Sequence, residues 1–149
     1  GRPRMEALLL TLLIFIQDES DYDVAEFLTH DRPLPTVVLD DPKAIKLMAG
    51  VHASLDVQAM YEREANRIWL PWTIDADTPK GKSLIVHELV HMLQHEVPNK
   101  EFECLKAREF EAYEIQEAYL LEKTGESNVQ WLDVIAFSMC PPPFAPPNR

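Results

Sequence analysis

The chain has 149 residues, a formal net charge of −11 and an isoelectric point near 4.8. Hydrophobic residues make up 46% of it and charged residues 26%, which is an ordinary composition for one globular domain with a single core. A chain with this much negative charge repels phosphate backbones and anionic lipid surfaces. Nucleic-acid binding and docking on anionic membranes are therefore not expected.

The first predicted element is a helix over residues 5–17, built on the apolar run ALLLTLLIFI. This run is too short to span a bilayer, because a transmembrane helix needs about 20 apolar residues. Arg2 and Arg4 precede it as in a signal peptide, but residues 17–20 offer no small-residue cleavage site. We therefore expect a helix packed into the core, without stable membrane insertion. Residues 1–4 can be native or a remnant of processing.

Five short elements follow: a helical turn or loop, a strand, a helical turn and two further strands. They cover residues 24–28, 36–39, 43–48, 59–62 and 67–70. The last two are strand-like runs joined by a polar segment, which predicts an antiparallel hairpin.

Two long helices are predicted in the second half of the chain. Thr78 can cap the first and Pro79 suits its first position, so we expect a helix over residues 80–96. The second is expected over residues 101–122, with Gly125 ending it.

A last short helix is predicted over residues 131–139, before a proline-rich segment that cannot be helix interior. The elements together predict an α+β fold with a small antiparallel or mixed sheet. We expect one domain over residues 1–140 and an extended tail over residues 141–149.

The segment His87-Glu88-Leu89-Val90-His91 is a complete HExxH motif within an almost wholly apolar helix. Residues four apart share a helix face, so both imidazoles can reach one Zn²⁺ ion, which favours nitrogen ligands. Glu88 is rotated by about 100° from His87, beside the metal, where it can act as the general base. Burying these polar groups without partners is costly, which favours a metal site over incidental core histidines.

A catalytic zinc needs a third protein ligand. His95 is disfavoured, because residues eight apart on a helix lie about 12 Å apart along its axis. The metzincin position of a third histidine is occupied by Val97. Glu109 lies in the bulkiest apolar stripe of the next predicted helix and is the favoured ligand, with Glu111 as the alternative.

The motif, with Glu109 eighteen residues after His91, resembles the gluzincin arrangement, in which a glutamate on a following helix completes the zinc site. Tyr113 stands where many small gluzincins have an aspartate that contacts a ligand histidine. A closer resemblance is to small uncharacterised bacterial HExxH proteins of minigluzincin character. It is carried by RIWLP at residues 67–71, LIVHELVHMLQ, Cys104, AREFEAYEIQ and Cys140.

From the residues alone, the two cysteines can be separate buried thiols or a disulfide. The resemblance implies a Cys104–Cys140 bridge and an exported, periplasmic or secreted protein, with the cytoplasm as the alternative. It also implies a zincin-like fold, but it names no substrate.

The predicted function is a zinc metallopeptidase acting on peptide or protein substrates, with Zn²⁺ held by His87, His91 and Glu109. Tyr113, Tyr61 and His52 are candidate stabilisers of the transition state, and the strand over residues 59–62 or 67–70 could bind substrate by strand addition. Two rival hypotheses remain: a zinc-binding regulatory module without turnover, and a latent protease held shut by the segment 141–147.

Overall fold

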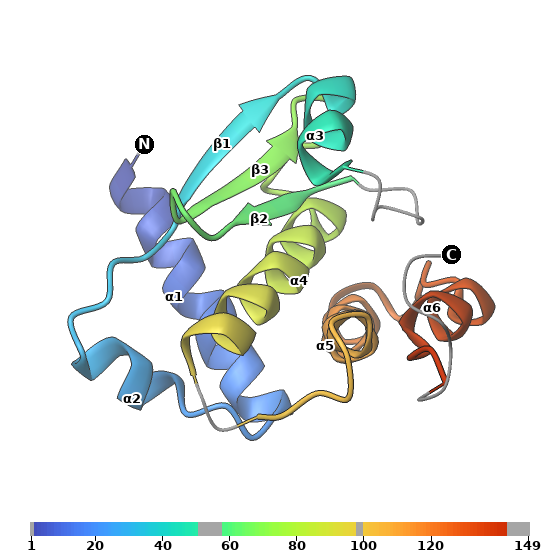
Figure 1. Ribbon diagram of the computed structural model, residues 1–149. Coiled ribbons are helices and arrows are strands. Elements are labelled where there is room, and N and C mark those ends of the chain that lie inside the picture. Colours follow the sequence, from blue (N-terminus) through green and yellow to red (C-terminus); the bar gives the residue numbers. More distant parts are fainter. Residues whose placement is uncertain (1, 51–57, 98–99, 143–149) are drawn as a thin grey trace.

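The computed structural model describes residues 2–50, 58–97 and 100–142, and these form six helices and a three-stranded sheet (Figure 1). In chain order the elements are α1 (Arg2–Glu19), α2 (Val24–Thr29), β1 (Thr36–Asp40), α3 (Pro42–Ala49), β2 (Met60–Glu62), β3 (Arg67–Pro71), α4 (Pro79–Glu96), α5 (Ala107–Thr124) and α6 (Trp131–Ser138). The predicted α+β class is confirmed. The predictions for His52 and for tail residues 143–149 fall outside the described residues.

The sheet has the strand order β1-β3-β2, with β1 parallel and β2 antiparallel to β3. The predicted hairpin is therefore present and the sheet is mixed. Asn66 takes a positive φ of 50° in the turn, and its N–H bonds the carbonyl of Arg63. Because β3 is paired on both sides, the prediction that residues 67–70 could accept a substrate strand is wrong. Of the two candidates, only β2 lies at an edge of the sheet.

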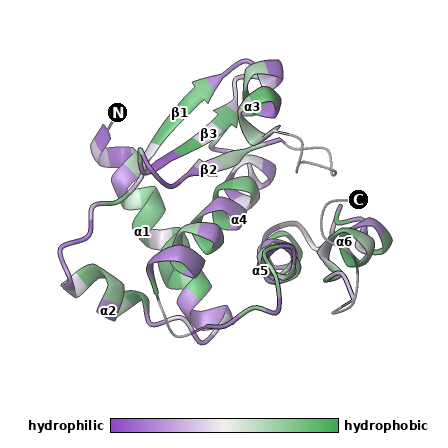
Figure 2. Ribbon diagram, in the orientation of Figure 1, coloured by the Kyte–Doolittle hydropathy of each residue, from purple (hydrophilic) through white to green (hydrophobic). Residues whose placement is uncertain are grey.

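The core lies between α1, α4 and the sheet. The inner face of α1 buries Leu9, Leu12, Leu13 and Ile16, as expected for a helix packed into the core. Figure 2 shows that β1 is largely hydrophobic, whereas the turn between β2 and β3 and the start of β3 are hydrophilic. Among the described residues, no helix is both long and apolar enough to cross a bilayer.

Helix α4 is the central element and contacts α1, α5, β2 and β3 (Figure 1). Its start follows the prediction: the Thr78 side chain accepts a hydrogen bond from the Gly81 N–H, and Pro79 opens the first turn. Gly81 is required there, because a Cβ atom would lie 2.1 Å from the carbonyl oxygen of Asp75. The preceding loop thus packs directly on the helix and fixes the side of α4 that faces the sheet.

Helix α5 begins at Ala107, so the prediction of a helix from residue 101 is wrong for its first six residues. Cys104 is joined to Cys140 by the disulfide that the resemblance implied. This bond holds the chain in a turn, in which the N–H of Ala107 bonds the carbonyl of Cys104. Leu105 precedes the helix and is 74% exposed.

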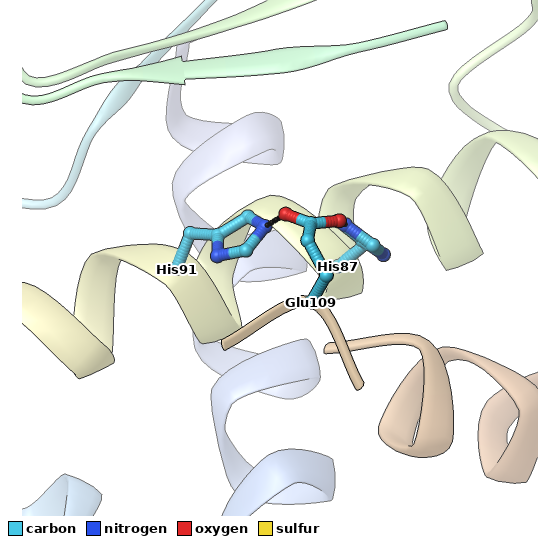
Figure 3. A group of neighbouring side chains, drawn as sticks. All are labelled: His87, His91 and Glu109. Carbon is cyan, nitrogen blue, oxygen red and sulfur yellow. Dashed lines mark ion pairs between the residues drawn. The ribbon is translucent and has the colours of Figure 1, made fainter. Parts of the chain in front are cut away.

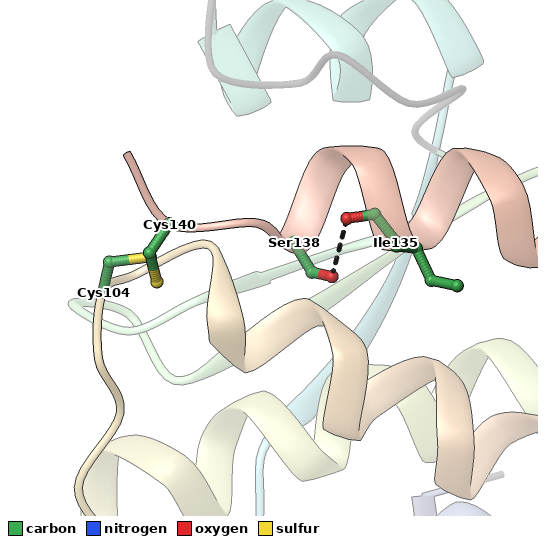
Figure 4. The surroundings of a disulfide bond; sticks show 4 residues. All are labelled: Cys104, Ile135, Ser138 and Cys140. Atoms are coloured by element: carbon green, nitrogen blue, oxygen red, sulfur yellow. Dashed lines mark hydrogen bonds between the residues drawn. A yellow bond between two sulfur atoms is a disulfide. The ribbon is translucent and has the colours of Figure 1, made fainter. Parts of the chain in front are cut away.

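Helix α6 packs on α5, on the side away from α1 (Figure 1). The Trp131 indole N–H donates to Glu117 of α5 at 2.7 Å, and the Trp131 ring lies 5.3 Å from that of Phe110. Figure 4 shows the disulfide at the other end of α6, where it ties the chain after the helix to the chain before α5. Both ends of α6 are therefore anchored to the α5 region.

Candidate metal centre

His87 and His91 lie one turn apart on α4, with ring centroids 4.9 Å apart. Apolar neighbours on the same helix are fully buried and fix its rotation, among them Ile85, Leu89 and Leu93. This packing leaves both imidazoles facing Glu109 of α5 (Figure 3). The HExxH spacing therefore places two ring nitrogens on one face, as predicted.

Glu109 reaches the same point from the first turn of α5 (Figure 3). Its Oε1 lies 2.5 Å from Nε2 of His91, and its Oε2 lies 3.3 Å from Nε2 of His87. One ligand atom from each of the three residues lies within 4.8 Å of the others. These three residues could therefore hold a metal ion, and they are the set that the sequence favoured.

Two glutamines orient the histidines. Nδ1 of His87 donates to Oε1 of Gln116, and Nδ1 of His91 to Oε1 of Gln94, each at 2.8 Å. With Nδ1 acting as the donor, Nε2 of each ring faces Glu109, and its lone pair is available when the ring is neutral. Gln116 supplies the contact that the resemblance left in doubt at Tyr113. The contact comes from a glutamine rather than from the aspartate of the small gluzincins. The signal in the sequence is that Gln116 shares the helix face of Glu109.

Glu111, the alternative ligand, lies outside this group. Its carboxylate accepts hydrogen bonds from the Tyr22 hydroxyl, from Nε2 of Gln94 and from Nζ of Lys100, the last at 2.5 Å. Nε2 of Gln94 also donates to the carbonyl of Arg108, which fixes the orientation of the amide. Glu111 therefore holds Gln94, which in turn orients His91, and Glu111 does not line the cavity.

The Glu109 carboxylate and His91 form a charge pair. Burial favours the neutral carboxyl, but the hydrogen bonds from His87 and His91 outweigh it and hold the pKa of Glu109 well below its usual range. Burial likewise lowers the pKa of His91, yet the hydrogen bond to Glu109 and the charges of Glu109 and Glu88 raise it to about 9. With this pKa, Nε2 of His91 carries a proton at neutral pH, and a metal ion would displace that proton.

Glu88 is 6% exposed and lies beside this group rather than within it. Burial raises the pKa of its carboxyl, whereas the charges of His87 and His91 and the backbone amide of Tyr61 lower it in part. A raised pKa means that this carboxylate holds a proton more readily than an exposed glutamate, as a group that accepts and returns a proton must.

The three residues and Glu88 lie at the wall of a cavity of about 600 Å³. Most of its lining residues come from four elements and the chain segments beside them. They are Ser83, Leu84, His87, Glu88, His91 and His95 of α4; Ala59, Met60 and Tyr61 at β2; Arg108, Glu109, Tyr113 and Gln116 of α5; and Val129, Gln130, Asp133, Val134 and Phe137 at α6. Helix α6 supplies the wall opposite the sheet, an element whose role the sequence did not indicate.

The other predicted site residues differ in position. The ring of Tyr113 meets that of His87 edge-on at 4.5 Å, and burial followed by the charges of Glu109 and Glu88 raises the pKa of its hydroxyl. The Tyr61 ring lines the cavity, but its hydroxyl already donates to Oδ1 of Asn66. His95 lies at one end of the cavity, outside the metal group, as its spacing predicted.

The fold and the site define a small α+β protein in which two histidines and a glutamate could hold a metal ion beside a cavity. The chain belongs to the family described as a domain of unknown function, DUF6647, whose model matches residues 4–147. No curated protein and no solved structure matches the chain. The family description assigns no activity.

Proposed function

We propose that the chain is a gluzincin-like zinc hydrolase that cleaves peptide or related amide bonds, on a zincin-like fold. The observation that carries this proposal is the convergence of His87, His91 and Glu109 next to a buried Glu88 at one cavity. Two imidazole nitrogens and a carboxylate oxygen are a donor set that zinc accepts, with a fourth position open to water. When bound, zinc would polarise the substrate carbonyl and lower the pKa of a water molecule.

The chain's own residues supply the proton transfers. The Glu88 carboxylate accepts a proton from the attacking water and returns it to the leaving amine, which its raised pKa favours. The Tyr113 hydroxyl stays protonated at neutral pH and can donate a hydrogen bond to a developing oxyanion. The edge strand β2 lines the cavity and offers a place for an extended peptide.

The cavity itself favours turnover over a purely regulatory zinc site. Helix α6 and the residues before it wall the cavity opposite the sheet, so the described residues enclose a place for a substrate. The disulfide that anchors α6 is consistent with maturation in an oxidising compartment, and export to the periplasm or the medium is part of the proposal. The rival in which residues 141–147 close the cavity rests on a segment almost wholly outside the described residues.

The test is a peptide-library cleavage assay on zinc-loaded chain, with Glu88→Gln as the matched control. Glu88→Gln keeps the size of the side chain and one acceptor oxygen but removes the base. We expect both proteins to bind one zinc ion and only the wild type to cleave. If both bind zinc and neither cleaves any library member, the regulatory hypothesis replaces the hydrolase.

A further inference from the structure

One cationic and one polar side chain, Arg108 and His95, lie next to each other in the lining of the cavity. Arg108 comes from the first turn of α5 and His95 from the last turn of α4, and Nη1 of Arg108 lies 3.3 Å from Nδ1 of His95. Both line the same cavity as the metal group. His95 is four residues beyond His91, which is about 6 Å along the helix axis.

The guanidinium of Arg108 has no counter-ion among the described residues. Its sequence neighbour Glu109 faces the two histidines, and Glu111 is paired with Lys100. Nε of Arg108 is buried without a hydrogen-bond partner, and the guanidinium packs over the Phe102 ring at 5.7 Å. A partly buried cation that lacks an anion is costly, and it is unexpected in a chain of net charge −11.

His95 adds a second donor. Because Nη1 of Arg108 can only donate, Nδ1 of His95 is the acceptor and the ring carries its proton on Nε2. Burial and then the charges of Arg108 and Arg63 lower the pKa of His95, so the ring is neutral at pH 7. It stacks on Tyr61 with centroids 6.5 Å apart, and its Nε2–H has no partner among the described residues. This end of the cavity therefore offers N–H donors and one uncompensated positive charge.

We infer that Arg108, with His95 beside it, binds a carboxylate of the substrate in the cavity. The inference rests on the proposed function, because it takes the substrate to be a peptide bound at the metal group. Guanidinium and carboxylate pair with two parallel hydrogen bonds, which fixes the position of the substrate as well as its charge. An extended peptide advances about 3.4 Å per residue, so a separation of about 6 Å places the carboxylate one or two residues from the scissile bond. The carboxylate is either the C-terminus of the peptide or an aspartate or glutamate side chain.

The test measures peptide binding to the full chain carrying Glu88→Gln, so that bound peptide is not cleaved. Three N-acetylated tetrapeptides serve as probes: tetra-alanine with a free C-terminus, the same peptide amidated, and an amidated peptide with glutamate at the third position. Their affinities are compared by NMR titration in the Glu88→Gln background alone and with Arg108→Gln, Arg108→Lys or Arg63→Gln added. Arg63 is the matched control, because it is an exposed arginine near His95 that does not line the cavity.

We expect one of the two carboxylate peptides to bind about ten- to a hundredfold more tightly than the neutral peptide. This preference should vanish with Arg108→Gln, fall part of the way with Arg108→Lys and persist with Arg63→Gln. Which peptide is preferred tells whether the chain recognises a C-terminus or an acidic side chain.

The preference ratio is independent of any general loss of stability, and Arg108→Lys carries the test if Arg108→Gln fails to fold. Equal affinities for all three peptides, or a preference that survives both Arg108 substitutions, would overturn the inference. Failure to bind zinc or to cleave any peptide bears on the proposed function instead. A carboxylate preference that remains in that case would support the site as part of a binding module.

Discussion

Replacing Gln116 with leucine tests whether the hydrogen bonds behind the histidines prepare the site for a metal. Gln116 is 5% exposed, and its Oε1 accepts the only hydrogen bond that Nδ1 of His87 makes among the described residues. Gln116→Leu has a similar volume but leaves that N–H buried and unpaired, and it frees the ring to rotate or to exchange tautomers. Loss of such a contact weakens metal binding by about ten- to a hundredfold, or about 1.4–2.7 kcal/mol.

The assay is a zinc titration against a chromophoric chelator, with Gln130→Leu as the control. Gln130 lines the same cavity before α6 and makes no capping hydrogen bond with its side chain. We expect Gln116→Glu to keep or raise the affinity, because a carboxylate accepts the same hydrogen bond and adds charge. The unpaired N–H should also lower the unfolding free energy of the metal-free Gln116→Leu chain by about 1–3 kcal/mol. Zinc affinities within a factor of two between Gln116→Leu and Gln130→Leu would refute the reasoning.

Three further predictions concern the proton on His91, the Tyr113 hydroxyl and the disulfide. The pKa of His91 is raised to about 9 from 6.5, so its proton stabilises the metal-free fold fully below pH 6.5, and this contribution is lost as the pH rises through 9. Because zinc must displace that proton, zinc affinity should rise about tenfold per pH unit up to pH 9. Calorimetry near pH 7.5 in buffers of different ionisation enthalpy should show about one proton released per zinc ion bound. A zinc affinity that does not change with pH would contradict this. Tyr113→Phe should leave zinc affinity unchanged while it lowers kcat by at least about tenfold, and an unchanged kcat would remove Tyr113 from the mechanism. Serine at both Cys104 and Cys140, which are 36 residues apart, should lower the unfolding free energy in denaturant titrations by about 2–4 kcal/mol; an unchanged midpoint would mean that α6 is held by its other contacts alone.

The motif helix could be predicted in detail because several signals in the sequence agree. Thr78 and Pro79 mark its start, Pro98 follows its end, and the apolar residues around His87 and His91 require burial on nearly every side. Local chemistry and tertiary packing therefore specify the same segment.

The second helix was harder to predict, since its start depends on a contact between distant parts of the chain. Residues 101–106 contain good helix formers, but α5 begins only after the turn at Cys104, which the disulfide joins to Cys140. Glu109 nevertheless faces His87 and His91, because the residues that share its face inside α5, Ala112 and Gln116, are buried.

Partners that come together only in three dimensions could not be predicted. Gln94 and Gln116 are ordinary polar residues in the sequence, and only the crossing of α4 and α5 brings their amides against the histidine rings. Arg108 directly precedes Glu109 in the sequence. Adjacent helix residues point about 100° apart, and the two side chains take different partners.

The central claim is that His87, His91 and Glu109 hold one zinc ion. X-ray absorption spectroscopy at the zinc edge, on chain loaded with one equivalent of zinc, tests it most directly. The account predicts one bound ion with two imidazole nitrogens and oxygen ligands at about 2.0–2.2 Å, and loss of one oxygen ligand or of tight binding in Glu109→Ala. A chain that takes up no zinc, or one whose zinc environment is the same in Glu109→Ala as in the wild type, would contradict it.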